Sequence, residues 1–155
     1  MKMMSEEAES SRCRIHSRDR MLLRAETRLK MGYGVGVLLA VAVVLFAKVI
    51  GLDRDRAFYP TVLMVVASYY ILFAAMGGSG RALITEIAVA LGFSLVAAVG
   101  FKRNLRYVAA GLIGHGLFDF VHHRYVANAG VPGWWPAFCL AFDVTAGVWL
   151  ALSLR

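Results

Sequence analysis

The run Val35-Gly-Val-Leu-Leu-Ala-Val-Ala-Val-Val-Leu-Phe-Ala47 decides the class of fold to which this chain belongs. It carries no charge and lies within a longer apolar segment, about 32–52. Such a segment is long enough to cross the roughly 30 Å hydrocarbon core of a bilayer as an α-helix. The whole chain of 155 residues is 59% hydrophobic and 17% charged, which is more apolar than an ordinary water-soluble domain. These properties predict an integral membrane protein.

Four more apolar segments follow the first one, separated by short loops rich in charged residues, glycine or proline. The predicted fold is therefore all-α, an integral membrane bundle of about five transmembrane helices. The third and fourth segments are short enough for one of them to be a buried or re-entrant helix. Residues 31–155 form the predicted helical domain, with spans at about 32–52, 58–76, 81–101, 107–126 and 134–154.

Residues 1–30 form a basic N-terminal tail of mixed charge. Its part from 17 to 30 could be a short amphipathic helix on the membrane surface, or the whole tail could be solvated and partly disordered. The net charge of +7 is carried largely by this tail and by residues that flank apolar segments, which favours contact with anionic lipid and not with nucleic acid. The first apolar segment is expected to be retained and not cleaved as a signal. Cys13 and Cys139 lie in different environments, so no disulfide is predicted.

The fourth apolar segment contains the unusual run His115-Gly-Leu-Phe-Asp119-Phe-Val-His122-His123. At about 100° per residue, His115, Asp119 and His122 share one helical face, and His123 lies to its side. Ionisable groups at bilayer depth are costly unless they pair, bind a metal or meet water. This run therefore predicts a functional site.

Other polar residues lie at a similar predicted height on neighbouring helices, because short loops place residues at matched distances along antiparallel helices. We expect a polar cavity that opens toward the turn at 77–80 and the loop around Pro132, with an apolar opposite half. The residues that converge there are Glu86 on the third segment, Cys139 and Asp143 on the fifth, and Tyr69 and Tyr70 on the second.

Histidine and carboxylate side chains on one face suit a divalent metal, zinc or iron. The predicted metal ligands are His115, Asp119, His122 and Asp143. Asp119 is a ligand or a general base, and Glu86 orients water or a ligand. Supporting or substrate-contacting positions are assigned to His123, Tyr69, Tyr70, Cys139 and Arg81.

Structural explanations stand beside these roles. Pairs of histidine and aspartate can act as hydrogen bonds that join membrane helices, worth about 1 kcal/mol each. Cys139 could be a small core residue, and the tyrosines could serve packing. Arg81 follows a glycine-rich stretch that forms an ordinary tight turn or a contact with a lipid headgroup.

The pattern His115-x3-Asp119-x2-His122-His123, with Pro132, Trp135-Pro136 and Asp143 after it, resembles a family of small, uncharacterised bacterial polytopic membrane proteins. That family brings no established activity, but the resemblance implies the bacterial inner membrane. The pattern is also faintly similar to the histidine boxes of membrane fatty-acid desaturases and hydroxylases, and to the metal ligands of ceramidase-like membrane hydrolases. The chain has one box where desaturases have several, and fewer spans than those hydrolases.

Three functions fit the sequence. The first is a metal-dependent membrane enzyme, a hydrolase or an oxidoreductase, that acts on a lipid or another small apolar substrate. The second is a proton- or cation-coupled transporter or channel in which the same groups carry the ion. The third is an assembly or scaffold protein whose polar residues lock helices together. Membrane lipid is the expected partner, and the chain could also associate with copies of itself.

Overall fold

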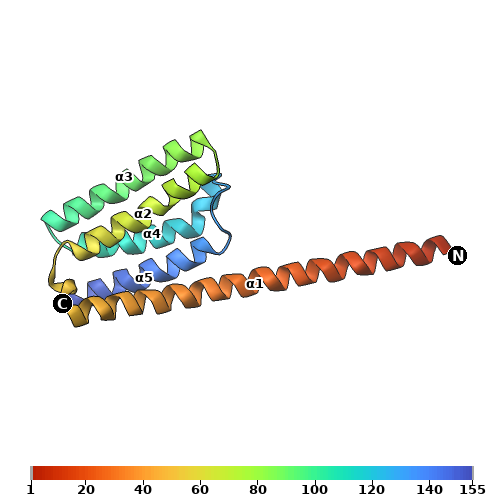
Figure 1. Cartoon of the computed structure of the whole chain (residues 1–155), viewed down its shortest axis with the longest axis horizontal. Helices are drawn as coiled ribbons and strands as arrows, with labels where there is room; N and C mark the ends of the chain where they lie inside the picture. Colours follow the sequence, from red (N-terminus) through yellow and green to blue (C-terminus); the bar gives the residue numbers. More distant parts are fainter. Residues whose placement is uncertain (1, 155) are drawn as a thin grey trace.

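A computed structural model describes the backbone of residues 2–154 and the side chains of residues 20–154. This part of the chain consists of five α-helices and one 3-10 turn, which confirms the predicted all-α fold class. The helices run antiparallel in sequence order and are joined by short connections (Figure 1). Their bounds are α1 (Lys2–Ile50), η1 (Leu52–Arg54), α2 (Phe58–Met76), α3 (Gly80–Lys102), α4 (Arg106–Tyr125) and α5 (Trp135–Ser153).

Four of these helices are long and apolar enough to cross a membrane: α2, α3, α5 and the part of α1 from Arg20 to Ile50. Helix α4 has 20 residues, against 19 in α2 and in α5, but it is less apolar because it carries the ionisable run around Asp119. Helix α4 packs mainly on α5 and to a smaller extent on α3, while its outward face stays exposed, with 58% of Leu117 and 57% of Phe120 accessible. The polar residues around Asp119 lie on the inward face of this helix.

Helix α1 is continuous from Lys2 to Ile50, with no break near residue 30 between the predicted tail and the first span. Figure 1 shows its N-terminal part extending well beyond the other helices. The side chains from Arg20 to Met31 are all exposed, and those near Leu29 lie beside the end of the bundle formed by the loop after α4. The side chains of Cys13 and of residues 17–19 lie outside the described residues.

The rest of α1 packs against α5, and a glycine sets the distance between the two helices. A Cβ atom at Gly36 would collide with the carbonyl oxygen of Phe138 and would lie 2.9 Å from the Cβ of Ala141. Small residues allow this kind of close approach between membrane helices. Helix α1 is therefore held by α5, while α2 contacts η1 but has little direct contact with α1.

The turn after α2 and the loop after α4 lie at the same end of the bundle, as the sequence predicted. Gly77 in the turn approaches Gly130 in the loop so closely that a Cβ at Gly77 would lie 2.9 Å from the Gly130 nitrogen. Ser79 caps α3, because its hydroxyl accepts a hydrogen bond of 3.3 Å from the Ala82 N–H. These contacts fix the end of the bundle where the predicted polar residues lie.

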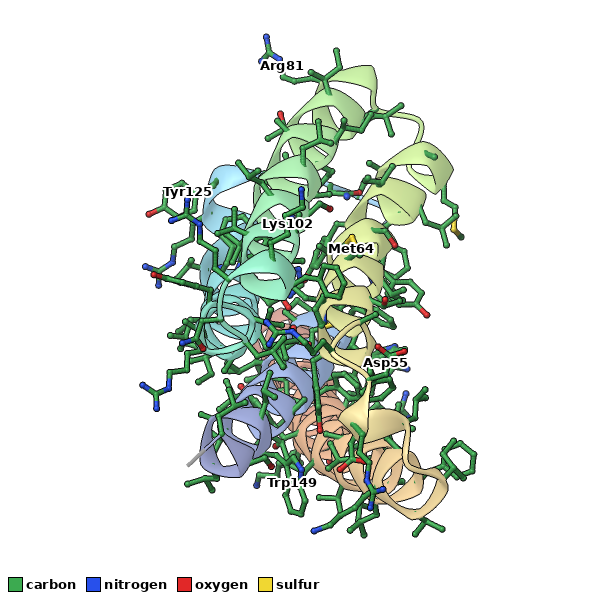
Figure 2. The ribbon with its side chains drawn as sticks, turned by 90° about the vertical axis from the view of Figure 1, so that its left-hand side faces the viewer. Asp55, Met64, Arg81, Lys102, Tyr125 and Trp149 are labelled. Atoms are coloured by element: carbon green, nitrogen blue, oxygen red, sulfur yellow. The ribbon has the colours of Figure 1, made fainter. Side chains whose placement is uncertain are left out.

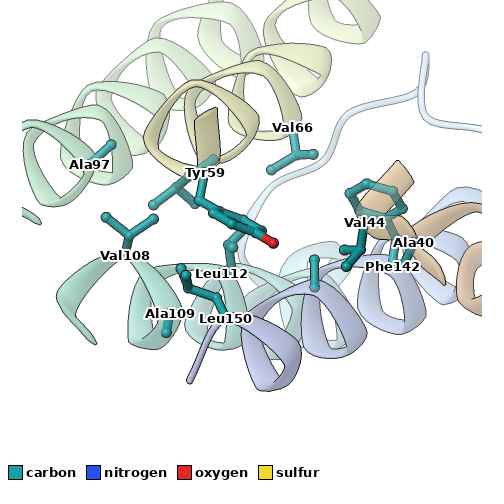
Figure 3. Packing of buried hydrophobic residues seen from close by; sticks show 12 residues of the cluster. Ala40, Val44, Tyr59, Val66, Ala97, Val108, Ala109, Leu112, Phe142 and Leu150 are labelled. Carbon is teal, nitrogen blue, oxygen red and sulfur yellow. The ribbon is translucent and has the colours of Figure 1, made fainter. Parts of the chain in front are cut away.

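The opposite half of the bundle is filled by an apolar core. Figure 3 shows its side chains meeting between the helices, with the ring of Tyr59 near the centre. Leu63 of α2 and Leu112 of α4 are fully buried there. The core consists of Ala40, Val44, Tyr59, Leu63, Val66, Ala97, Val108, Ala109, Leu112, Phe142, Ala146 and Leu150.

Candidate metal site

Three ionisable side chains from α4 and α5 meet inside the bundle, and we call His115, Asp119 and Asp143 the central cluster. Each offers one ligand atom, and these atoms lie within 4.8 Å of one another. His115 Nδ1 lies 2.7 Å from Asp143 Oδ2 and 3.4 Å from Asp119 Oδ2. The exposed fraction of each residue is at most 1%. The arrangement is a compact, buried set of donors that could hold a metal ion.

The carboxylates of the central cluster have unused hydrogen-bonding capacity. Within the described part of the chain, neither oxygen of Asp119 has a hydrogen-bond partner, and Asp143 Oδ1 has none either. A buried polar group without a partner costs about 1–3 kcal/mol, and a charged one costs more. Two carboxylates beside one imidazole also favour a bound positive charge. The cluster is therefore suited to a cation or to extra protons.

The local sequence explains how the cluster forms. His115 and Asp119 stand four residues apart on α4, so they project from the same helical face. Gly116 lets α5 approach that face, because a Cβ there would lie 3.1 Å from the Asp143 Cβ and 3.2 Å from the Leu140 carbonyl oxygen. The close packing of α4 on α5 brings Asp143 within hydrogen-bond distance of His115.

A second buried group, the outer network, consists of His122, Glu86 and Asn128. His122 Nε2 donates to Glu86 Oε1 over 2.8 Å, and the Asn128 amide nitrogen donates to the same oxygen over 2.9 Å. That amide also donates to the carbonyl oxygen of Tyr70 over 3.2 Å. Among the described residues, no buried side-chain nitrogen or oxygen of these three lacks a partner. The outer network joins α3, α4, α2 and the loop after α4.

Aromatic rings separate and enclose the two groups. The Tyr70 ring lies 4.3 Å from the His122 ring and 6.4 Å from the His115 ring, measured between centroids. Its hydroxyl adjoins Asp119 without completing a hydrogen bond, and the Phe93 ring packs 4.8 Å from His115. These rings limit the access of water to the central cluster.

A pocket of about 370 Å³ opens beside the outer network at the end of the bundle formed by the loop after α4. The sequence predicted a polar cavity on this side, and the pocket lies there. We call it the vestibule. Its walls include His122, His123, Asn128 and Pro132, together with Leu29, Tyr33, Phe120, Val126, Val131, Gly133, Pro136 and Ala137.

The structure brings only part of the predicted ligand set together. His122 is not in the central cluster, because its Nε2 atom is engaged by Glu86. Glu86 is buried, but its contacts are to His122 and Asn128 and not to the central cluster. His123 is exposed on the vestibule wall. A role for Glu86 at a metal would have to be exerted through His122.

Of the remaining predicted site residues, some lie next to the central cluster and others lie away from it. Cys139 and Tyr70 are buried and adjoin Asp119. Tyr69 is 39% exposed and packs edge-on against Trp135, with 5.2 Å between ring centroids. Arg81 is exposed at the start of α3, and Figure 2 shows it at the top of the view, projecting outward from the bundle. Arg81 therefore makes no contribution to the buried site.

Sequence reasoning missed Asn128 and Phe93. Asn128 lies in a loop with strong turn residues, and asparagine is common in such turns because its side chain bonds nearby backbone. Its side chain does accept such a bond from the Gly130 N–H over 3.2 Å, but its amide nitrogen turns inward to Glu86. The one signal in the sequence for this contact is that Glu86, a buried carboxylate on a predicted span, needs a hydrogen-bond donor, and Asn128 in the nearby loop carries one.

Comparisons with protein-family models, with curated proteins and with solved structures found no match for this chain. The site is consequently interpreted from its own geometry. The chain has four helices suited to crossing a membrane and a buried His115, Asp119 and Asp143 cluster that could hold a metal ion.

Proposed function

We propose that this chain is a metal-dependent membrane enzyme that hydrolyses a lipid or another apolar substrate at the central cluster. The observation that carries the proposal is the set of unpartnered carboxylate oxygens on Asp119 and Asp143 beside His115. Buried carboxylate oxygens that lack hydrogen-bond partners can be satisfied by a bound cation. The proposed membrane is the bacterial inner membrane, on the sequence resemblance alone.

Zinc is the metal that this donor set favours. One imidazole nitrogen and two carboxylate oxygens give three protein ligands of the types that zinc accepts, with a position left for water or substrate. A divalent ion would also balance the charge of two carboxylates beside a neutral histidine. The common iron site with open positions uses two histidines and one carboxylate. His122, the second histidine such a site would need, is bonded to Glu86.

The surrounding residues suit hydrolysis. When bound, zinc would lower the pKa of a water molecule to about 7 and polarise a carbonyl group. Asp119 has two free oxygens, so one can bind the ion while the other accepts a proton from water. The Tyr70 hydroxyl is buried beside this carboxylate and is free to donate to a substrate oxygen. His115, held at Nδ1 by Asp143, is fixed in orientation.

The apolar core weighs against transport of an ion through the bundle. A transport path needs polar groups in both halves of the membrane, since unsatisfied ions are costly in hydrocarbon. The half opposite the site is filled by residues such as Leu63, Leu112 and Leu150. A purely structural role accounts for the outer network, whose hydrogen bonds are complete, but it leaves the unpartnered oxygens of Asp119 unexplained.

The test is metal analysis combined with turnover. The full chain, purified in mild detergent without chelator, is expected to contain about one zinc ion per chain, the number that a single three-ligand site holds. It is also expected to release fatty acid from an ester- or amide-linked lipid. Asp119→Ala should lose both properties, whereas Glu86→Gln should keep the metal. Absence of stoichiometric metal in the wild-type protein, or metal that persists in Asp119→Ala, would overturn the proposal.

A further inference from the structure

An apolar groove runs between α1, α2 and α5, next to the central cluster. Its volume is about 290 Å³, near the lower end of cavities that hold small ligands, which is about 300 Å³. Of the eleven residues that line it, only Thr61, Tyr69, Trp135 and Cys139 carry a polar atom in the side chain. The full lining is Leu39, Phe58, Thr61, Val62, Val65, Val66, Tyr69, Trp135, Phe138, Cys139 and Phe142.

The groove opens sideways, toward whatever surrounds the bundle. It exists because α1 packs on α5 while α2 packs on α3, so α1 and α2 stay apart beyond η1. Residues on both of its walls are exposed, with 44% of Leu39 and 47% of Val65 accessible. All three helices that form it are candidate membrane spans. The medium outside the groove is then the hydrocarbon of the bilayer, and acyl chains are what can enter it.

One residue connects the groove with the central cluster. Cys139 lines the groove, is 2% exposed, and adjoins Asp119. A groove that is apolar along its length and adjoins the polar cluster at one point suits a ligand with an apolar chain and a polar head.

We propose that the groove binds one acyl chain of a lipid substrate, with the carbonyl group at the head of that chain directed past Cys139 toward Asp119. This assignment rests on the proposed function, because it names the substrate class of the same site. The groove supplies the apolar contact, and Cys139 marks the point at which the groove adjoins the central cluster.

The experiment uses the full chain in lipid nanodiscs that contain a phosphatidylcholine with a photoactivatable diazirine in its acyl chain. After illumination, mass spectrometry locates the labelled residues. Leu39→Trp places a large ring in the groove, and Leu38→Trp is the matched control, because Leu38 is 71% exposed and does not line the groove. Both positions are exposed, so both variants should fold.

We expect labelling to concentrate on Phe138 and Phe142 in the wild-type protein and in Leu38→Trp. In Leu39→Trp, labelling at these positions and lipid turnover should both fall about tenfold, since displacing two methylene groups from apolar contact is enough for that change. Labelling spread evenly over exposed helix faces, or equal behaviour of the two variants, would overturn the inference, as would a second copy of the chain filling the groove.

Metal content measured on the same samples separates this inference from the proposed function. If zinc is absent but groove labelling and its loss in Leu39→Trp persist, the enzyme proposal fails and the acyl-chain site stands as a lipid-binding site. If zinc is present but the groove is not labelled, the acyl-chain assignment fails alone.

Discussion

The central cluster and the outer network are both buried and both depend on a histidine of α4, yet they differ in how completely their polar atoms are paired. In the outer network, Glu86 Oε1 receives two hydrogen bonds, from His122 and Asn128. In the central cluster, both oxygens of Asp119 lack partners within the described chain. Complete networks make a fold rigid, whereas incomplete ones are costly unless a ligand completes them. We therefore infer that the outer network stabilises the fold and that the central cluster binds a ligand.

The largest effect on stability should come from breaking the outer network at its shared acceptor. Glu86→Leu leaves two buried N–H donors without this acceptor, at about 1–3 kcal/mol each, so the free energy of unfolding should fall by about 2–6 kcal/mol. Reversible unfolding in mixed detergent micelles measures this change. Metal content should stay at the wild-type level in the folded fraction, and its loss would show that Glu86 belongs functionally to the central cluster.

The next effect concerns the spacing of α4 and α5 beneath the central cluster. Gly116→Ala places a methyl group 3.1 Å from the Asp143 Cβ, so the helices must separate slightly and the metal ligands must shift. We expect zinc affinity to fall about tenfold, which corresponds to about 1.4 kcal/mol. Competition with a fluorescent zinc chelator measures it.

Gly114→Ala is the control for that substitution, since a Cβ at Gly114 would meet no other residue within 4 Å. Its zinc affinity should match the wild type. Equal losses in the two variants would mean that helix distortion, and not the distance between α4 and α5, changes the site.

A smaller effect of opposite sign is expected when the unpartnered carboxylate of Asp119 is neutralised. Asp119→Asn removes a buried charge whose oxygens have no hydrogen-bond partner among the described residues, so the free energy of unfolding without metal should be about 1 kcal/mol higher than in the wild type. Thermal unfolding after chelation measures it. A clear loss of stability would contradict the view that this carboxylate is kept for binding.

The smallest effect is expected at His123, which neighbours His122 in sequence but is exposed on the vestibule wall. His123→Ala should change stability by less than about 0.5 kcal/mol, as is usual for surface substitutions. Metal content and unfolding measured together test this. A loss of metal would move His123 into the site.

The sequence predicted the helices well because their apolar runs are long and their breaks contain glycine, proline or charge. The one-turn relation of His115 to Asp119 followed from helical geometry, and the inclusion of Asp143 followed from matched depth across a short loop. Comparing the heights of residues along neighbouring helices does not show how each helix is rotated about its own axis. His122 shares a face with His115 in projection, but it lies about 10 Å along the helix and meets Glu86 of α3 instead.

Contacts that depend on loop conformation or on gaps between helices could not be predicted. Asn128 reaches Glu86 only because the loop after α4 folds over the end of the bundle, against the turn at Gly77. The groove beside Cys139 exists because α1 and α2 are packed on different partners, and hydrophobic patterns do not specify which helices become neighbours. Both features are tertiary, and the residues involved have ordinary local roles in the sequence.

The most direct test of the division between the two groups is the metal content of His115→Gln and His122→Gln. The two histidines are matched, since both are on α4 and both are at most 2% exposed. We expect that His115→Gln loses the zinc ion and that His122→Gln retains it while unfolding more easily. Loss of zinc in His122→Gln, or retention in His115→Gln, would contradict the assignment of binding to the central cluster.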